Sequence, residues 1–137
     1  MRILGLDHGT VRVGVAVSDE LGMIAFAMEY IPIEPLEGFL ERLRKIIAEK
    51  EVELIIVGMP RNMDGTYGPA AQKVREFIAL LEGKLALPIK AWDERLTSVA
   101  AHKALASGNV KARDRKGKID QIAAQILLQS YLDSRAL

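Results

Sequence analysis

Residues 3–18 read Ile-Leu-Gly-Leu-Asp-His-Gly-Thr-Val-Arg-Val-Gly-Val-Ala-Val-Ser, two apolar runs joined by a short polar step. This pattern is typical of two strands in a tight hairpin, so we expect strands over Ile3–Asp7 and Arg12–Ser18. A third strand-like run, Met23–Ile33, follows and is closed by nearby prolines. The start of the chain therefore predicts an antiparallel meander of three strands.

After residue 35 the sequence changes to helices that alternate with strands. Apolar residues between Leu36 and Ile47 recur at helical spacing. Glu53–Gly58 is instead a short, largely apolar run of the kind found in buried parallel strands. The same reasoning predicts four more elements in this order: a helix over Ala70–Leu81, a strand over Pro88–Trp92, and helices over Ser98–Ala106 and Ile119–Leu132.

The resulting order, β-β-β-α-β-α-β-α-α, predicts an α/β fold in one domain over residues 1–137. It builds a mixed five-stranded sheet from a three-stranded antiparallel meander and two parallel strands, with helices on both faces. This order suits the ribonuclease-H-like fold. It is also similar to half of an actin-like or sugar-kinase ATPase, so a second fold family stays open.

The composition narrows the class of protein. Half of the 137 residues are hydrophobic and 27% are charged, which favours a packed globular domain over disorder. The absence of cysteine excludes disulfides, thiolate catalysis and cysteine-ligated zinc. The sequence has neither a secretory signal nor an apolar run of about 20 residues that could cross a membrane. We therefore expect a cytoplasmic protein that does not bind membranes.

Acidic residues on three separate elements are candidates for chemistry. Asp7 closes an apolar strand, where a carboxylate is costly unless it is paired, hydrogen-bonded or metal-bound; a turn aspartate that caps the hairpin is the alternative. Glu94, beside Asp93, follows the fifth strand, near the sheet edge where α/β proteins bind ligands, although this segment could simply cap the next helix. Asp120 opens the last helix beside its apolar stripe, or is a solvated first-turn aspartate.

If these carboxylates converge, they form a site for hard divalent cations. Oxygen ligands suit Mg²⁺ or Mn²⁺, and two such ions about 4 Å apart can bind the attacking water and the leaving oxygen of a phosphodiester. We therefore expect the side chains of Asp7, Asp120 and one of the pair Asp93 and Glu94 to hold two ions and to be the catalytic residues. Neither histidine indicates a metal site, and we do not expect His8 to be the general base.

Basic residues are distributed unevenly, although the net charge is only +1. Residues 111–118 read Lys-Ala-Arg-Asp-Arg-Lys-Gly-Lys, which favours a mobile loop that binds substrate over a merely solvated charged face. The loop over residues 60–69 is long for a strand–helix connection and offers further phosphate contacts. The expected substrate-binding residues are Arg12, Arg61, Asn62, Arg95, Lys111, Arg113, Arg115, Lys116 and Lys118.

Four segments resemble motifs of the YqgF/RuvX-like nucleases, in the family's order and over nearly the whole chain. The segments are Gly-Leu-Asp-x-Gly-Thr-x-Arg-x-Gly-Val-Ala-x-Ser-Asp at 5–19, Val-Gly-x-Pro with Met-Asp-Gly-Thr-x-Gly at 57–68, Asp-Glu-Arg-Leu-Thr-Ser at 93–98, and Asp-x-x-Ala-Ala-x-Ile-Leu-Leu-Gln-x-Tyr-Leu at 120–132. The resemblance implies a ribonuclease-H-like fold and a carboxylate site matching Asp7, Glu94 and Asp120. RuvC-like enzymes also carry an acid near the fourth strand, where this chain has Gly58-Met59-Pro60, so Glu94 must supply the second ligand.

The resemblance also implies a hydrolase: a divalent-metal-dependent nuclease that processes the 5′ end of pre-16S rRNA. The alternative that it supplies is resolution of four-way Holliday junction DNA. The expected partners are therefore pre-rRNA or branched DNA, together with ribosomal precursor particles, and the protein is a monomer or a homodimer.

Two readings without nuclease activity also stay open. A non-catalytic adaptor on a nuclease fold predicts salt-sensitive nucleic-acid binding with no metal-dependent cleavage. An actin-like ATPase needs two such domains around its nucleotide. This chain is too short to contain both, so this reading requires that it pairs with another subunit.

Overall fold

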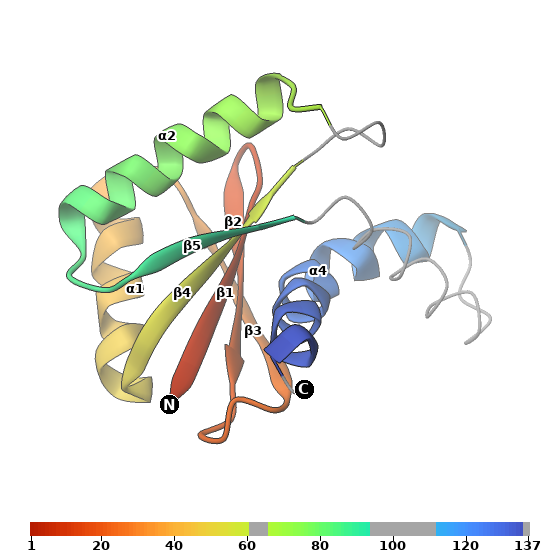
Figure 1. The fold of residues 1–137 in the computed structure, drawn as a ribbon. Coiled ribbons are helices and arrows are strands. Elements are labelled where there is room, and N and C mark those ends of the chain that lie inside the picture. Colours follow the sequence, from red (N-terminus) through yellow and green to blue (C-terminus); the bar gives the residue numbers. More distant parts are fainter. Residues whose placement is uncertain (61–65, 94–111, 136–137) are drawn as a thin grey trace.

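The computed structural model describes residues 1–60, 66–93 and 112–135, and it describes only the backbone course of residues 112–121. The strands form one five-stranded sheet in the order β3-β2-β1-β4-β5 (Figure 1). Strands β1 to β3 are antiparallel, and β4 and β5 continue the sheet parallel to β1, as the sequence predicts. The strands are β1 (Arg2–His8), β2 (Arg12–Ser18), β3 (Ala25–Pro32), β4 (Val52–Met59) and β5 (Ile89–Asp93).

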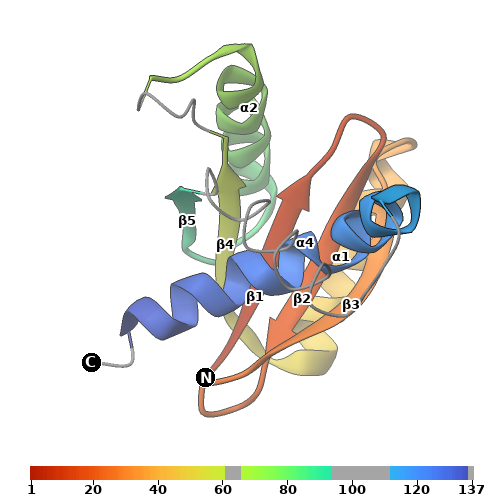
Figure 2. The ribbon, with the colours of Figure 1, turned by 90° about the vertical axis from the view of Figure 1, so that its right-hand side faces the viewer.

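Helices cover both faces of this sheet, as expected. Helices α1 (Leu36–Lys50) and α2 (Pro69–Lys84) lie on one face and α4 (Ala112–Arg135) crosses the other (Figures 1 and 2). Side chains that alternate along each strand therefore enter two separate cores. In β1, Leu4 and Leu6 belong to the core under α1 and α2, whereas Ile3 belongs to the core under α4.

Local hydrogen bonds fix the position of the turn in each of the two hairpins of the meander. In the first, the Gly9 amide donates to the Arg12 carbonyl at 3.0 Å, and a Cβ at residue 9 would lie 2.7 Å from that oxygen, so only glycine fits. In the second, the Asp19 carboxylate accepts hydrogen bonds from the amides of Met23 and Ile24 at 2.8 and 3.0 Å. This turn uses two residues predicted to be strand, so β3 begins at Ala25 rather than at Met23.

Helix α4 is longer than the sequence predicts. It begins at Ala112 instead of Ile119, so the stretch 112–118, expected as a mobile loop, is helical backbone. Alanine, arginine and lysine are strong helix formers, and Gly117 alone in this stretch is unfavourable in a helix. Lys111 and the predicted helix over Ser98–Ala106 lie outside the described residues.

Helix α4 is fastened to both edges of the sheet. Gln129 accepts a hydrogen bond from the Ala25 amide and donates one to the Met23 carbonyl, each at 2.9 Å, beside β3. At the other edge the Trp92 indole of β5 donates to Ser130 Oγ at 3.2 Å, and its ring meets the Tyr131 ring edge-on at 5.2 Å. Within the described part of the chain, no helix is both long and apolar enough to cross a membrane.

Candidate active site

Asp7 lies near the carboxyl end of the central strand β1, where its side chain is partly buried. It shares the α4 face of the sheet with Ile3, because successive side chains of a strand alternate between faces. Beside it opens a pocket of about 440 Å³. The residues that line this pocket come from β1, the first hairpin, β2 and β3, and they are Asp7, Gly9, Thr10, Val11, Arg12, Gly14 and Tyr30.

The strands on both sides of Asp7 carry glycine beside it. Gly14 of β2 is the register partner of Asp7. On the other side Leu6 pairs with Val57 of β4, so the next residue, the buried Gly58, continues the row beside Asp7. Neither neighbour projects a side chain over the carboxylate, which leaves space for a ligand to reach its oxygens.

The sequence placed Arg12 among the substrate-binding residues, and it lines the same pocket as Asp7. Its guanidinium carbon lies 4.0 Å from the centre of the Tyr30 ring, in a cation–π contact. Sequence reasoning missed Tyr30, which lies opposite Gly14 in the β2–β3 register.

His8 faces away from Asp7, toward the α2 side of the sheet. Its imidazole lies 4.5 Å from the ring of Phe77 on α2. Burial lowers the pKa of His8 below 6.5, and the Lys73 ammonium lowers it further, against an opposing effect of the Asp7 carboxylate. The lowered pKa favours the neutral form of the ring, and the contact with Phe77 assigns His8 to the α2 layer. His102 lies outside the described residues.

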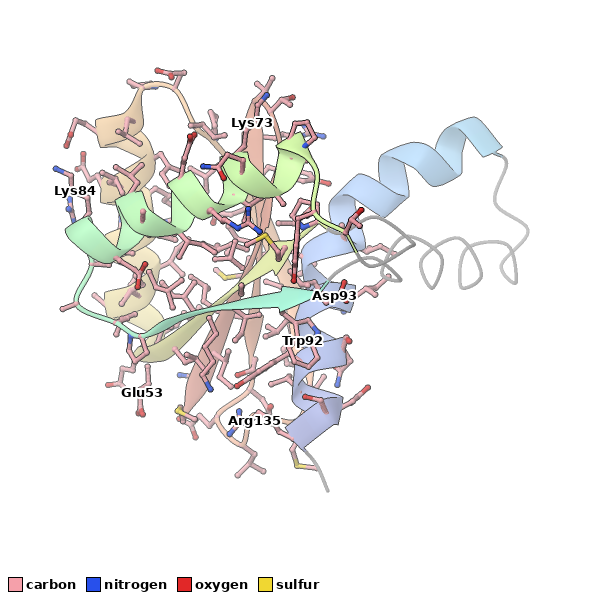
Figure 3. All side chains as sticks on the ribbon, turned by 45° about the horizontal axis from the view of Figure 1, so that its top comes forward. Glu53, Lys73, Lys84, Trp92, Asp93 and Arg135 are labelled. Atoms are coloured by element: carbon pink, nitrogen blue, oxygen red, sulfur yellow. The ribbon has the colours of Figure 1, made fainter. Side chains whose placement is uncertain are left out.

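Asp93, the last residue of β5, lies on the opposite face of the sheet from its neighbour Trp92. Trp92 packs with the core under α4, whereas Asp93 pairs with Met59, which belongs to the opposite core (Figure 3). Asp93 is thus on the α2 side of the sheet, away from the face of Asp7. Glu94 and Arg95 lie outside the described residues, as do Arg61 and Asn62.

The course of α4 brings residue 120 toward the carboxyl end of β1. The carboxyl end of α4 lies at the same end of the molecule as the start of β1 (Figure 1). Ala124 covers Gly14, because a Cβ at residue 14 would lie 3.6 Å from Ala124 Cβ. Asp120 is one helical turn, about 5–6 Å, before Ala124, and the preceding turns carry Arg113, Arg115, Lys116 and Lys118.

The described residues include the side chain of only one predicted metal ligand, Asp7. Among those residues, no group of three or more histidine or carboxylate side chains could hold a metal ion. The described portion therefore supplies one carboxylate, an open glycine-lined space and one arginine, on the face of the sheet that α4 covers.

Comparison with known proteins identifies a family model and several relatives that match this chain. Residues 1–134 match a family model described as "RuvX: Holliday junction resolvase". A "Putative pre-16S rRNA nuclease" from Halothermothrix orenii is 51% identical over 133 residues, covering 97% of this chain and 95% of the relative. A protein with the same name from Geobacillus sp. (strain WCH70) is 51% identical over 137 residues, covering 98% and 99%.

Solved structures agree on the fold. The Fowlpox virus resolvase in complex with Holliday junction DNA matches with a TM-score of 0.56 at 14% identity, covering all of both chains. T. thermophilus RuvC in complex with a Holliday junction substrate matches with a TM-score of 0.54 at 15% identity, covering 98% of this chain and 95% of that one. The sheet order and these matches confirm the predicted ribonuclease-H-like fold, and the extent of the family match shows that this chain belongs to the RuvX family.

Proposed function

We propose that this chain is a divalent-metal-dependent nuclease that processes the 5′ end of pre-16S rRNA, with Asp7, Glu94 and Asp120 as its catalytic carboxylates. Membership of a nuclease family makes the chain a hydrolase of phosphodiester bonds. The choice of pre-16S rRNA follows the names of relatives about 50% identical over nearly the full length. The observation that carries the proposal is Asp7, placed at the carboxyl end of the central strand beside an open pocket.

The surroundings of Asp7 fit a hard cation. Carboxylate oxygens are ligands that Mg²⁺ and Mn²⁺ prefer, and the neighbouring Gly14 and Gly58 project no side chain over those of Asp7. Asp7, Glu94 and Asp120 would hold Mg²⁺ or Mn²⁺, two ions being the expected number. Such ions, when bound, polarise the phosphodiester and make water acidic enough to supply the nucleophile.

The structure favours Glu94 over Asp93 as the second ligand. Asp93 shares the face of Met59, opposite to Asp7. Strand alternation continued by one residue would assign position 94 to the face of Asp7. Asp120 is proposed as the third ligand because its helical turn precedes the one that covers Gly14.

Basic residues would hold the strand to be cut. Arg12 lines the pocket and can donate hydrogen bonds to a phosphate oxygen next to the carboxylates. The residues Arg113, Arg115, Lys116 and Lys118 in the first half of α4 would contact the sugar-phosphate backbone further along. Arg61, Asn62, Arg95 and Lys111 remain proposed substrate contacts from the sequence.

The decisive experiment is cleavage of a labelled RNA that carries the pre-16S 5′ leader, with Mg²⁺ or Mn²⁺, by wild type and Asp7→Asn. We expect metal-dependent cleavage by wild type and a loss of at least 100-fold in Asp7→Asn, with the thermal unfolding midpoint retained. Glu53→Gln is the matched control, because Glu53 lies at the far end of β4 (Figure 3). Equal cleavage by wild type and Asp7→Asn would remove the carboxylate mechanism.

A four-way DNA junction tests the second candidate function, resolution of Holliday junctions, which the family description favours. Paired symmetric cuts in the junction, with no cleavage of the leader, would select resolution and would require two copies acting together. Salt-sensitive binding of either substrate without cleavage would instead select the non-catalytic adaptor.

A further inference from the structure

The pocket beside Asp7 is bounded by a row of residues that crosses three strands. Asp7 of β1 pairs with Gly14 of β2, and Gly14 pairs with Tyr30 of β3. Paired residues lie on the same face of a sheet, so Tyr30 stands on the α4 face with Asp7. A Cβ on Gly14 would lie 3.5 Å from the Tyr30 ring, so Gly14 forms the floor between the carboxylate and the ring.

Arg12 lies over that ring, at 4.0 Å from its centre. Arg12 and Gly14 are two residues apart in β2, so they share the α4 face. A guanidinium in a cation–π contact can still donate hydrogen bonds from its N–H groups to a ligand.

We propose that Tyr30 is a positioning residue that aligns Arg12 to bind the phosphate next to the scissile phosphodiester. The pocket combines a cation with a carboxylate, so an anionic ligand fits at Arg12 while the Asp7 side of the pocket is left for the metal-dependent chemistry. Without the ring, the long arginine side chain gains rotamer freedom and must lose it again on binding. This inference rests on the proposed nuclease function and assigns its phosphate subsite.

The test is a double-variant cycle on binding and cleavage. Tyr30→Leu removes the ring, Tyr30→Phe keeps it, Arg12→Gln removes the cation, and the fourth protein carries Tyr30→Leu with Arg12→Gln. Binding is measured in an Asp7→Asn background with labelled single-stranded leader RNA, over a series of salt concentrations. Cleavage is measured with Asp7 intact, and kcat and KM are determined separately.

We expect Arg12→Gln to weaken binding roughly tenfold and to reduce the salt slope by about 0.7, the value for one phosphate contact on a single strand. Tyr30→Leu should weaken binding roughly threefold or more and raise KM with little change in kcat. The double variant should bind as Arg12→Gln does, because Tyr30 acts through Arg12. Tyr30→Phe should bind as wild type does. If Tyr30→Leu fails to fold, Tyr30→Met, which also removes the ring but retains a long apolar side chain, takes its place in the cycle with the same expected result.

Other outcomes would overturn the inference. Additive losses in the double variant would show that Tyr30 contacts RNA by itself, and a loss in Tyr30→Phe would assign the effect to the hydroxyl. If wild type cleaves the leader, Asp7→Asn does not, and the Arg12 and Tyr30 variants bind normally, the subsite is wrong while the nuclease function stands. If wild type cleaves neither RNA nor junction DNA, the proposed function itself fails.

Discussion

Asp7 and His8 are neighbours in sequence but belong to opposite faces of the sheet. The alternation of β1 directs Asp7 to the glycine-lined pocket and His8 to Phe77 of α2. A histidine next to a proposed catalytic aspartate could be mistaken for a general base. Its ring contact assigns it instead to the layer that α2 covers, and this has a consequence for stability at acid pH.

We expect the free energy of unfolding to fall as the pH drops below about 6.5. The folded state holds the pKa of His8 below the ordinary value of 6.5, so the unfolded chain binds more protons between the two values. Stability from this group is therefore complete above pH 6.5 and decreases below it. Urea unfolding of wild type and His8→Gln at pH 7.5 and 5.5 checks this.

His8→Gln should remove the part of the pH dependence that lies between pH 7.5 and 5.5. His102 is unchanged in both proteins, so the difference between them isolates His8. The same variant should still cleave RNA, because His8 is outside the pocket. A variant with the wild-type pH dependence would show that His8 is not the group concerned.

The packing of α4 on β1 and β2 depends on two glycines with different tolerances. A Cβ at Gly5 would lie 2.8 Å from Leu128 Cβ and 3.4 Å from the Ala124 carbonyl oxygen. A Cβ at Gly14 would meet its neighbours at 3.5 Å or more, which is ordinary contact. The two positions therefore separate the effect of displacing the helix from the effect of filling the pocket.

We predict that Gly5→Ala lowers the free energy of unfolding by about 1–3 kcal/mol, because the added methyl group overpacks the interface with α4. Cleavage should fall with it, since residue 120 moves with the helix. Gly14→Ala is the matched variant: its stability should stay within about 1 kcal/mol of wild type, while cleavage falls because the floor of the pocket rises. Thermal unfolding and leader cleavage measure the two effects. Equal stability in both variants would contradict this account of the interface.

Much of each element could be predicted from periodicity, and the exceptions have local causes. The start of β3 is displaced because the Asp19 carboxylate binds the amides of Met23 and Ile24 in a turn. Helix α4 begins earlier than predicted because arginine and lysine are strong helix formers. The same residues also suggest a substrate-binding surface. Charge indicated a binding surface but did not distinguish a loop from a helix.

The pocket could be predicted only in part, because its far wall depends on strand register. The sequence indicates that Asp7 and Arg12 are candidate site residues, whereas it carries no such signal for Tyr30. The pairing of β2 with β3 shifts between Val15 and Ala16. Counting back from the turn without that irregularity would place Glu29 opposite Gly14, in the position that Tyr30 occupies.

At the scale of the whole molecule, α4 joins the end of the chain to its beginning. Gln129 bonds the backbone of Ala25 and Met23, 104 and 106 residues away in sequence, and Gln125 donates to the Ala25 carbonyl at 3.1 Å. These bonds satisfy backbone groups at the outer edge of the sheet, because β3 is the edge strand of the sheet that the described residues form.

We predict that Gln129→Leu lowers the free energy of unfolding by about 1–3 kcal/mol, because it leaves an amide and a carbonyl next to β3 without these partners. Gln72→Leu, on the exposed side of α2, is the control and should change stability by less than about 0.5 kcal/mol. Chemical denaturation of both variants and wild type provides the comparison. An undiminished stability in Gln129→Leu would mean that apolar packing alone holds α4 in place.

Helix α4 is the last element of the sequence, so it is the last element to be made during translation. A ribosome delivers the five strands and the helices of the first core before it reaches residue 112. Until α4 emerges, Ile3, Ala16 and Ile56 lack the helix that covers them in the described structure, and Asp120 has not yet been made. If Asp7 and Asp120 are both ligands, as proposed, a nascent or truncated copy carries the first acid of the site without the last. We therefore expect such a copy to leave the RNA of the translating ribosome uncut until α4 has been made.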